Sequence, residues 1–224
     1  MAGSEVPESR FDPDEALVPE TPESYDDPTE FHYPLPVLFL GSLLVTALAF
    51  VGFGTVLWWA QGPTVLDALV TATETETGLD VSFRVVPALG TFLVVVVVTT
   101  VVHELVHGVV AGRYGYTVTY GAAPHMGAFY ATPFHQFVRR EHQILVALAP
   151  LVVISVVGLP LLLVPVPWLA VAAFLALVFN ATGAVGDLYV TIVTLRLPAG
   201  TLFYDSDVRH SYVFRPSASA SPSK

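Results

Sequence analysis

The chain has 224 residues, of which 54% are hydrophobic and 12% are charged, and its formal net charge is −10. The apolar residues come in long blocks, which excludes an ordinary soluble domain and favours a polytopic membrane protein. The absence of cysteine excludes disulfide bonds and thiolate metal sites. The strong acidity argues against nucleic acid as a partner.

The first 33 residues hold ten of the nineteen acidic side chains. Their Glu, Asp, Pro and Ser content offers almost nothing to bury, so we expect residues 1–33 to form a disordered acidic tail. No basic stretch precedes an early apolar segment, so a signal peptide is not expected. The Ser- and Pro-rich end of the chain predicts a second, flexible tail over 199–224. The remaining residues, 34–198, are expected to form a transmembrane core.

Four apolar blocks lie between these tails, at residues 35–60, 85–112, 143–164 and 167–195. Each is about long enough to cross a bilayer core of ~30 Å as a helix. The sequence therefore predicts an all-α membrane protein with about four transmembrane helices. Because residues 165–167 form a very short link, the last two helices should be antiparallel neighbours.

The polar link between the second and third blocks carries a hairpin signal. Residues 114–120 and 127–132 are rich in aromatic and β-branched side chains, and a segment with Gly, Ala and Pro separates them. This pattern predicts a small β-hairpin between the second and third helices. An exposed strand edge beside a catalytic site would hold an extended peptide by strand addition, whereas an ordinary surface hairpin would have no such role.

Arginine is unevenly distributed among the polar segments. The link over 61–84 carries four acids against one arginine, whereas the link over 113–140 carries three arginines. The segment after the fourth block holds three more arginines and the lysine. By the positive-inside rule, the second link and both termini face the cytoplasm. We therefore expect an integral protein of the cell membrane with cytoplasmic termini, in contact with the lipid bilayer.

The segment His103-Glu104-Leu105-Val106-His107 interrupts the second apolar block. An acidic side chain at the bilayer centre costs about 2.5–3.5 kcal/mol, so this placement requires a compensating interaction. Two histidines four residues apart lie one turn apart on the same helix face, where they can bind one zinc ion. Glu104 beside them can act as the base toward a water that the zinc activates. The sequence therefore predicts His103 and His107 as Zn²⁺ ligands and Glu104 as the catalytic residue.

A hydrolytic zinc site usually has three protein ligands, and Asp187 is the leading candidate for the third. It is the only acid in the fourth block. Because the second and fourth helices should run in the same direction, Asp187 and the two histidines lie at similar depths, roughly 9–15 Å from the cytoplasmic boundary. Three histidines in or beside the second link are alternative third ligands: His125, His135 and His142. A solvated histidine there needs no metal to explain it.

Asn180 lies seven residues before Asp187, two turns away on the same helix face. It is a candidate substrate-orienting residue that donates to a substrate carbonyl, or else it bonds a neighbouring helix. Gly183 and Gly186, which lie between them, predict close packing of this helix against the helix with the two histidines.

The sequence His103-Glu-Leu-Val-His-Gly108 in one membrane helix, with Asn180 and Gly186-Asp187 in a later one, resembles the intramembrane zinc metalloproteases of the site-2 protease group. The resemblance is closest to a set of small zincin peptidases that are little more than the membrane core, and it covers about residues 36–196. The chain departs from the site-2 pattern where Leu188 follows the aspartate, because that group normally has a glycine there.

The resemblance implies a zinc site with a general base and a substrate that is anchored in the membrane. The implied zinc ligands are His103, His107 and Asp187. Glu104 is the implied base, and Asn180 is the implied substrate-orienting residue. The predicted function is therefore that of a zinc-dependent intramembrane endopeptidase that cleaves membrane-anchored proteins.

Two other classes of protein remain open at this stage. One is a membrane protein that binds or transports a metal without hydrolysis, and the other is a protease-like fold that binds client proteins without cleaving them. A transport path calls for polar residues along the full depth of the bilayer. Here they cluster at one depth, which favours a single site. The sequence does not indicate the oligomeric state.

Overall fold

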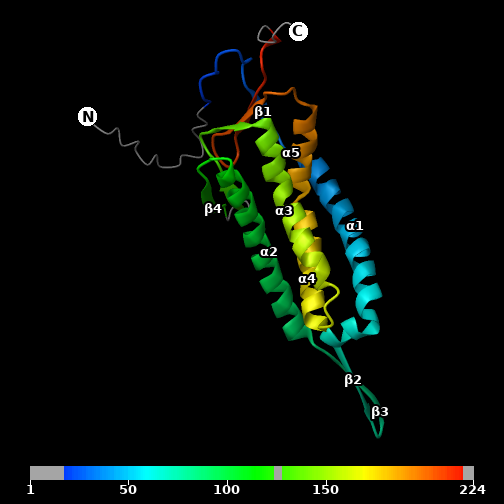
Figure 1. The fold of residues 1–224 in the computed structure, drawn as a ribbon. Coiled ribbons are helices and arrows are strands. Elements are labelled where there is room, and N and C mark those ends of the chain that lie inside the picture. Colours follow the sequence, from blue (N-terminus) through cyan, green and yellow to red (C-terminus); the bar gives the residue numbers. More distant parts are fainter. Residues whose placement is uncertain (1–17, 124–127, 219–224) are drawn as a thin grey trace, which may run out of the picture.

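The structure, a computed structural model, describes residues 18–123 and 128–218, and long apolar helices dominate it (Figure 1). Three of them are long and apolar enough to cross a membrane: α1 (Leu35–Gln61), α2 (Val85–Arg113) and α3 (Arg140–Leu161). A fourth span results if α4 (Pro167–Gly183) and α5 (Val185–Arg196) are taken together. The prediction of a mainly helical chain with about four possible membrane spans is therefore confirmed.

The fourth apolar block differs from expectation because it is not one continuous helix. It bends by 42° between α4 and α5, at Gly183 and Ala184. Glycine is a poor helix former, and two glycines lie within four residues here, at 183 and 186. The break places Asp187 in the first turn of α5. A carboxylate is favoured there because the helix dipole is positive at its N-terminus.

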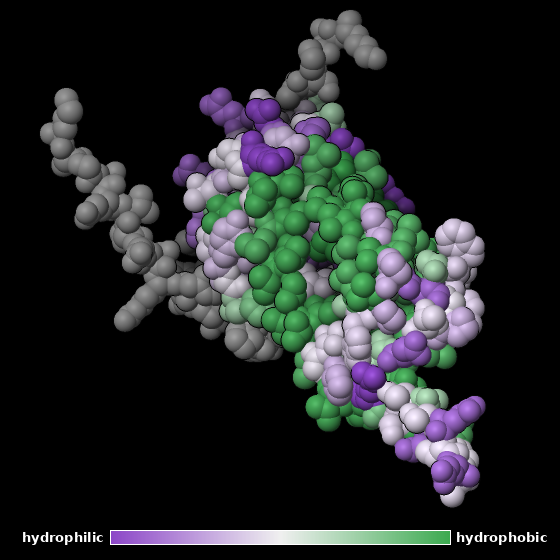
Figure 2. All heavy atoms as spheres, turned by 60° about the horizontal axis from the view of Figure 1, so that its bottom comes forward, coloured by the Kyte–Doolittle hydropathy of each residue, from purple (hydrophilic) through white to green (hydrophobic). Residues whose placement is uncertain are grey.

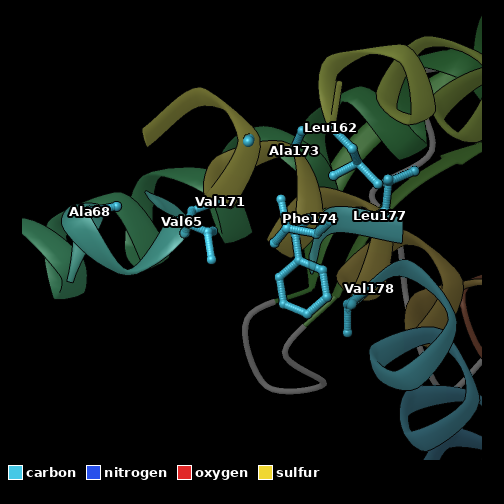
Figure 3. Close-up of a cluster of buried hydrophobic side chains, with 10 residues drawn as sticks. Val65, Ala68, Leu162, Val171, Ala173, Phe174, Leu177 and Val178 are labelled. Carbon is cyan, nitrogen blue, oxygen red and sulfur yellow. The ribbon is translucent and has the colours of Figure 1, made fainter. Parts of the chain in front are cut away.

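The central helix of the bundle is α4, which packs against α1, α2 and α3. Its buried side chains meet those of the short helix η1 (Gly62–Ala68) and the end of α3 in one apolar cluster (Figure 3). Close approach of α3 and α4 requires Gly158, because a Cβ atom at this position would come within 2.8 Å of Leu177.

The predicted hairpin between the second and third helices is present. Its strands are β4 (Thr119–Ala123) and β5 (Ala128–Thr132), paired antiparallel with Tyr120 opposite Ala131. A second hairpin, β2 (Val70–Thr75) with β3 (Gly78–Phe83), connects α1 and α2 at the opposite end of the bundle (Figure 1).

A four-stranded antiparallel sheet is a correction to the expected all-α class. Its strands, in spatial order, are β1 (Thr29–Phe31), β8 (Ser211–Phe214), β7 (Leu202–Asp205) and β6 (Phe137–Arg139). Three of these strands lie in the segments expected to be tails. The physical reason is that Phe203, Val213 and Phe214 are buried and supply a core of their own.

The surface divides by polarity along the bundle. Apolar side chains gather over the helices, and hydrophilic ones lie on the β2–β3 hairpin and at the far end (Figure 2). Both ends of the described chain lie at the end that carries the four-stranded sheet (Figure 1). An apolar belt between two polar ends is compatible with a membrane protein.

Candidate metal centre

His103 and His107 from α2 meet Asp187 from the first turn of α5. The potential ligand atoms of the three residues all lie within 4.8 Å of one another. The Nε2 atom of His103 is 3.1 Å from one carboxylate oxygen of Asp187, and the Nε2 atom of His107 is 3.4 Å from the other. The structure thus brings together the three residues that the sequence suggested as zinc ligands.

The second nitrogen of each ring is held by an oxygen acceptor. The Nδ1 atom of His103 lies 3.0 Å from Oδ1 of Asn180, and Nδ1 of His107 lies 2.9 Å from the backbone carbonyl of Val146. An oxygen acceptor requires a proton on Nδ1, which leaves Nε2 of a neutral ring as a lone pair. Hydrogen bonds of this kind orient histidines that bind metals.

These contacts test whether a cation fits the site. When both rings are neutral, their Nε2 lone pairs face the carboxylate of Asp187, and a divalent cation between them offsets the repulsion. Two imidazole nitrogens and one carboxylate oxygen are a donor set that catalytic zinc sites use. The residues present therefore fit Zn²⁺.

Glu104 lies beside the three residues and faces a cavity of about 330 Å³. The ligand residues His103, His107 and Asp187 also line this cavity. The backbone amide of Ala131 in β5 lies beside the Glu104 carboxylate. Glu104 is thus held at the wall of a space that could admit a substrate.

Two further cavities adjoin the first. One, of about 250 Å³, shares His103, Glu104 and Gly183 with it. The other, of about 270 Å³, shares Tyr33, Thr132 and Asp205. Glu104 therefore lies along a series of cavities, which suits an extended chain better than a compact small molecule.

Gly183 and Gly186 have a different role from the close packing that the sequence suggested. A Cβ atom at either position would meet nothing within 4 Å, and both residues line the central cavity. Because they have no side chains, the space beside the metal ligands stays open.

Asn180 is 1% exposed, and both ends of its amide are engaged. Its Oδ1 accepts from His103, and its Nδ2 donates to the carbonyl of Pro150 at 3.3 Å. It does not line either of the cavities that Glu104 lines. The substrate-orienting role stays a prediction, and the contacts favour the alternative of a bond to a neighbouring helix.

Two of the three alternative third ligands, His135 and His142, lie in the described residues, and each has other neighbours than the two metal-binding histidines. The ring of His142 stacks on Tyr114 at 4.1 Å and takes part in a hydrogen bond with the Tyr116 hydroxyl. The ring of His135 lies near Phe134 and Tyr204. His125 lies outside the described residues.

Two residues at the mouth of the cavity were not suggested by the sequence reasoning: Tyr33 and Asp205. Both lie in segments expected to be tails. Residues 202–205 and 211–214 are rich in aromatic and aliphatic side chains and flank a Ser- and Asp-containing turn. This is a hairpin signal that could have located Asp205. Burial raises the pKa of the Asp205 carboxyl, although a hydrogen bond from Ser211 opposes this.

Comparison with known protein families gives one match. Residues 96–202 match the model of a family described as "Putative zincin peptidase". The match spans slightly less than half of the 224 residues and includes the segment from His103 to Asp187. It supports a zinc metallopeptidase of the zincin type. No curated protein and no solved structure matches the chain.

Proposed function

We propose that this protein is a zinc-dependent endopeptidase that cleaves membrane-anchored proteins within or near the bilayer. The observation that carries the proposal is the convergence of Glu104, His103, His107 and Asp187 on one cavity. The similarity to a zincin family supports the same chemistry.

His103, His107 and Asp187 would hold the zinc ion, which as a Lewis acid polarises a scissile carbonyl and activates a water. Glu104 takes the proton of the attacking water and passes it to the leaving amine. The amide of Ala131, which lies beside the Glu104 carboxylate, favours the position that this transfer needs. The ring contacts on Nδ1 keep the two histidines facing Asp187.

The surroundings of Glu104 favour a polypeptide substrate. The adjoining cavities give room on both sides of Glu104. Ala131 and Thr132 of β5 line the central cavity, so an extended segment that lies there runs beside a strand. Strand addition to β5 is the binding mode that we propose for the substrate.

The apolar belt and the position of the site favour a substrate presented by the membrane. The site lies between helices long enough to span a bilayer. Val138 and Asp205 of the four-stranded sheet line its cavity, so it lies close to the end that carries this sheet. The distribution of arginine favours a cytoplasmic position for that end and for both termini, in a protein of the cell membrane. A membrane-anchored substrate would be cleaved near the cytoplasmic side.

Metal transport without hydrolysis is the rival function. Within residues 18–123 and 128–218, one group of His and Asp side chains could hold a metal ion. A transport path would need further polar sites along the helices. A single site with an acid beside it is better suited to hydrolysis.

Replacement of Glu104 by Gln tests the proposal. The variant should retain bound zinc and lose cleavage of a membrane-anchored reporter by about 10²–10⁴-fold, the usual contribution of a general base. Glu141→Gln is the matched control, because Glu141 is exposed and pairs with Arg140. Cleavage by Glu104→Gln at the wild-type rate, or zinc transport without cleavage in either form, would overturn the proposal.

A further inference from the structure

A proline lies within α3, at a buried position one turn after Val146. Pro150 has no N–H, so the carbonyl of Val146, four residues earlier, has no helical donor at that place. The pyrrolidine ring also pushes against that carbonyl. The helix thus offers a free acceptor in an apolar interior, where an unpaired carbonyl is costly.

His107 supplies the missing donor. Its Nδ1 atom lies 2.9 Å from the Val146 carbonyl. An ordinary residue at position 150 would restore the N–H that competes for this oxygen. The proline leaves this oxygen to His107 alone, which favours the contact that orients the ring.

The carbonyl of Pro150 itself reaches the other histidine through Asn180. The Nδ2 atom of Asn180 donates to this carbonyl at 3.3 Å, which fixes the amide so that Oδ1 faces Nδ1 of His103 at 3.0 Å. Position 150 of α3 is thereby linked to both histidines, to His107 through the missing N–H of the proline and to His103 through a carbonyl that any residue there would have.

We infer that Pro150 is a positioning residue for the metal centre, because it leaves the Val146 carbonyl to hold His107 in the Nδ1–H form with Nε2 facing Asp187. The inference rests on the metal-binding part of the proposed function. Contacts of this type typically change metal affinity by 10–100-fold when they are removed.

Pro160 is the matched control. It lies in the same helix, but it is exposed, and so is Val156, whose carbonyl it leaves without a helical donor. Pro150→Ala and Pro160→Ala make the same chemical change in one helix, and both replace proline by a better helix former. A difference in zinc binding between the two variants is therefore due to the position of Pro150 beside the metal centre.

The test measures the zinc affinity of the full-length protein in detergent by competition with a chelating dye, and the visible spectrum of its Co²⁺ form. Pro150→Ala should weaken zinc binding by about 10–100-fold and change the Co²⁺ spectrum. Pro160→Ala should match the wild type in both. Equal affinities and spectra for the two variants would overturn the inference.

A backbone ester at position 150, made with the α-hydroxy analogue of alanine, separates the N–H effect from the loss of the ring. The ester lacks the competing N–H, so its zinc affinity should return toward the wild type. An ester variant as weak as Pro150→Ala would overturn the inference.

The two proposals fail separately. Weakened zinc binding in Pro150→Ala, with no cleavage by the wild type, would remove the peptidase and keep the positioning role. Normal cleavage by the wild type, with equal zinc binding in all variants, would keep the peptidase and remove the positioning role of Pro150. A wild-type protein that binds no zinc would overturn both.

Discussion

His103 Nε2 lies 3.1 Å from Asp187 Oδ2, although the two residues are 84 positions apart in the chain. The bend between α4 and α5 makes this contact possible, because it places the first turn of α5, which carries Asp187, beside the two histidines. The carboxylate also lies at the N-terminal end of α5, where the helix dipole stabilises negative charge.

Asp187→Asn tests this relationship. Loss of the charged ligand should abolish most of the stabilisation that zinc gives. For the wild type, that stabilisation is about 2.7 kcal/mol at a zinc concentration 100 times the Kd. Thermal unfolding in detergent, with zinc and with a chelator, measures it. Asp67→Asn, which changes an exposed acid of η1, should keep the full zinc response. A zinc-dependent rise in Tm that Asp187→Asn leaves intact would exclude Asp187 as a ligand.

The sequence predicted the residues of the site where the free-energy cost of a charged group in an apolar segment could be used as an argument. Ionisable groups inside apolar segments have a high free-energy cost, which marked His103, Glu104 and Asp187 as candidate functional residues. The expected parallel direction of their helices then predicted that they lie at a similar depth. The contacts on Nδ1 were not accessible. They depend on which groups of α3 and α4 face α2, the Val146 carbonyl and the Asn180 amide, and no periodicity encodes this.

The sheet shows why the fold was only partly predictable. The strands at 202–205 and 211–214 are four residues each and pair with β1 and β6, which come from distant segments. Such short segments carry a weak signal beside the helical blocks, and acidic residues around β1 favoured an interpretation as a solvated tail. Burial of Phe203 and Phe214 in a local core outweighs that composition.

Gly183→Leu should fill the space beside the metal ligands. The backbone there is compatible with any L residue and a Cβ meets nothing within 4 Å, so the fold and the zinc affinity should persist. Cleavage of the reporter should fall, because the new side chain enters the cavities that Glu104 lines. Gly90→Leu on α2, equally open, is the control for added bulk. Equal cleavage by the two variants would mean that the substrate does not use this space.

Asp205→Asn should raise thermal stability at neutral pH. Burial raises the pKa of Asp205, so the folded state holds the proton more tightly than the unfolded chain does. Stability is then lost as the pH rises from the unfolded pKa, about 3.9, through the folded pKa. Asparagine does not ionise and avoids this loss. Each kcal/mol gained should raise Tm by about 2–4 °C.

Unfolding curves in detergent at pH 4 and pH 7 measure this difference. The gain of Asp205→Asn should be present at pH 7 and absent at pH 4. Asp80→Asn, on the exposed strand β3, should change neither curve. A gain of the same size at both pH values would show that the charge of Asp205 is not its cause.

Gly108→Val should lower cleavage through the hairpin rather than through the metal. A Cβ atom at position 108 would overlap the ring of Tyr120 in β4. Tyr120 is paired with Ala131, whose amide lies beside Glu104. Displacement of the ring should therefore shift the strand that holds the catalytic carboxylate, and a shift of about 1 Å can cost 10²-fold in rate. Zinc affinity should stay within the range of the wild type, because the ligands are not touched.

Gly112→Val, one turn later in α2, is the control, since a Cβ atom there meets nothing within 4 Å. The double variant Gly108→Val/Tyr120→Ala removes the ring that the valine displaces, so it should recover part of the lost cleavage. Recovery would locate the defect at the contact between α2 and β4. If the double variant cleaved no better than Gly108→Val alone, or if Gly112→Val lost as much activity, the hairpin would have no part in holding Glu104.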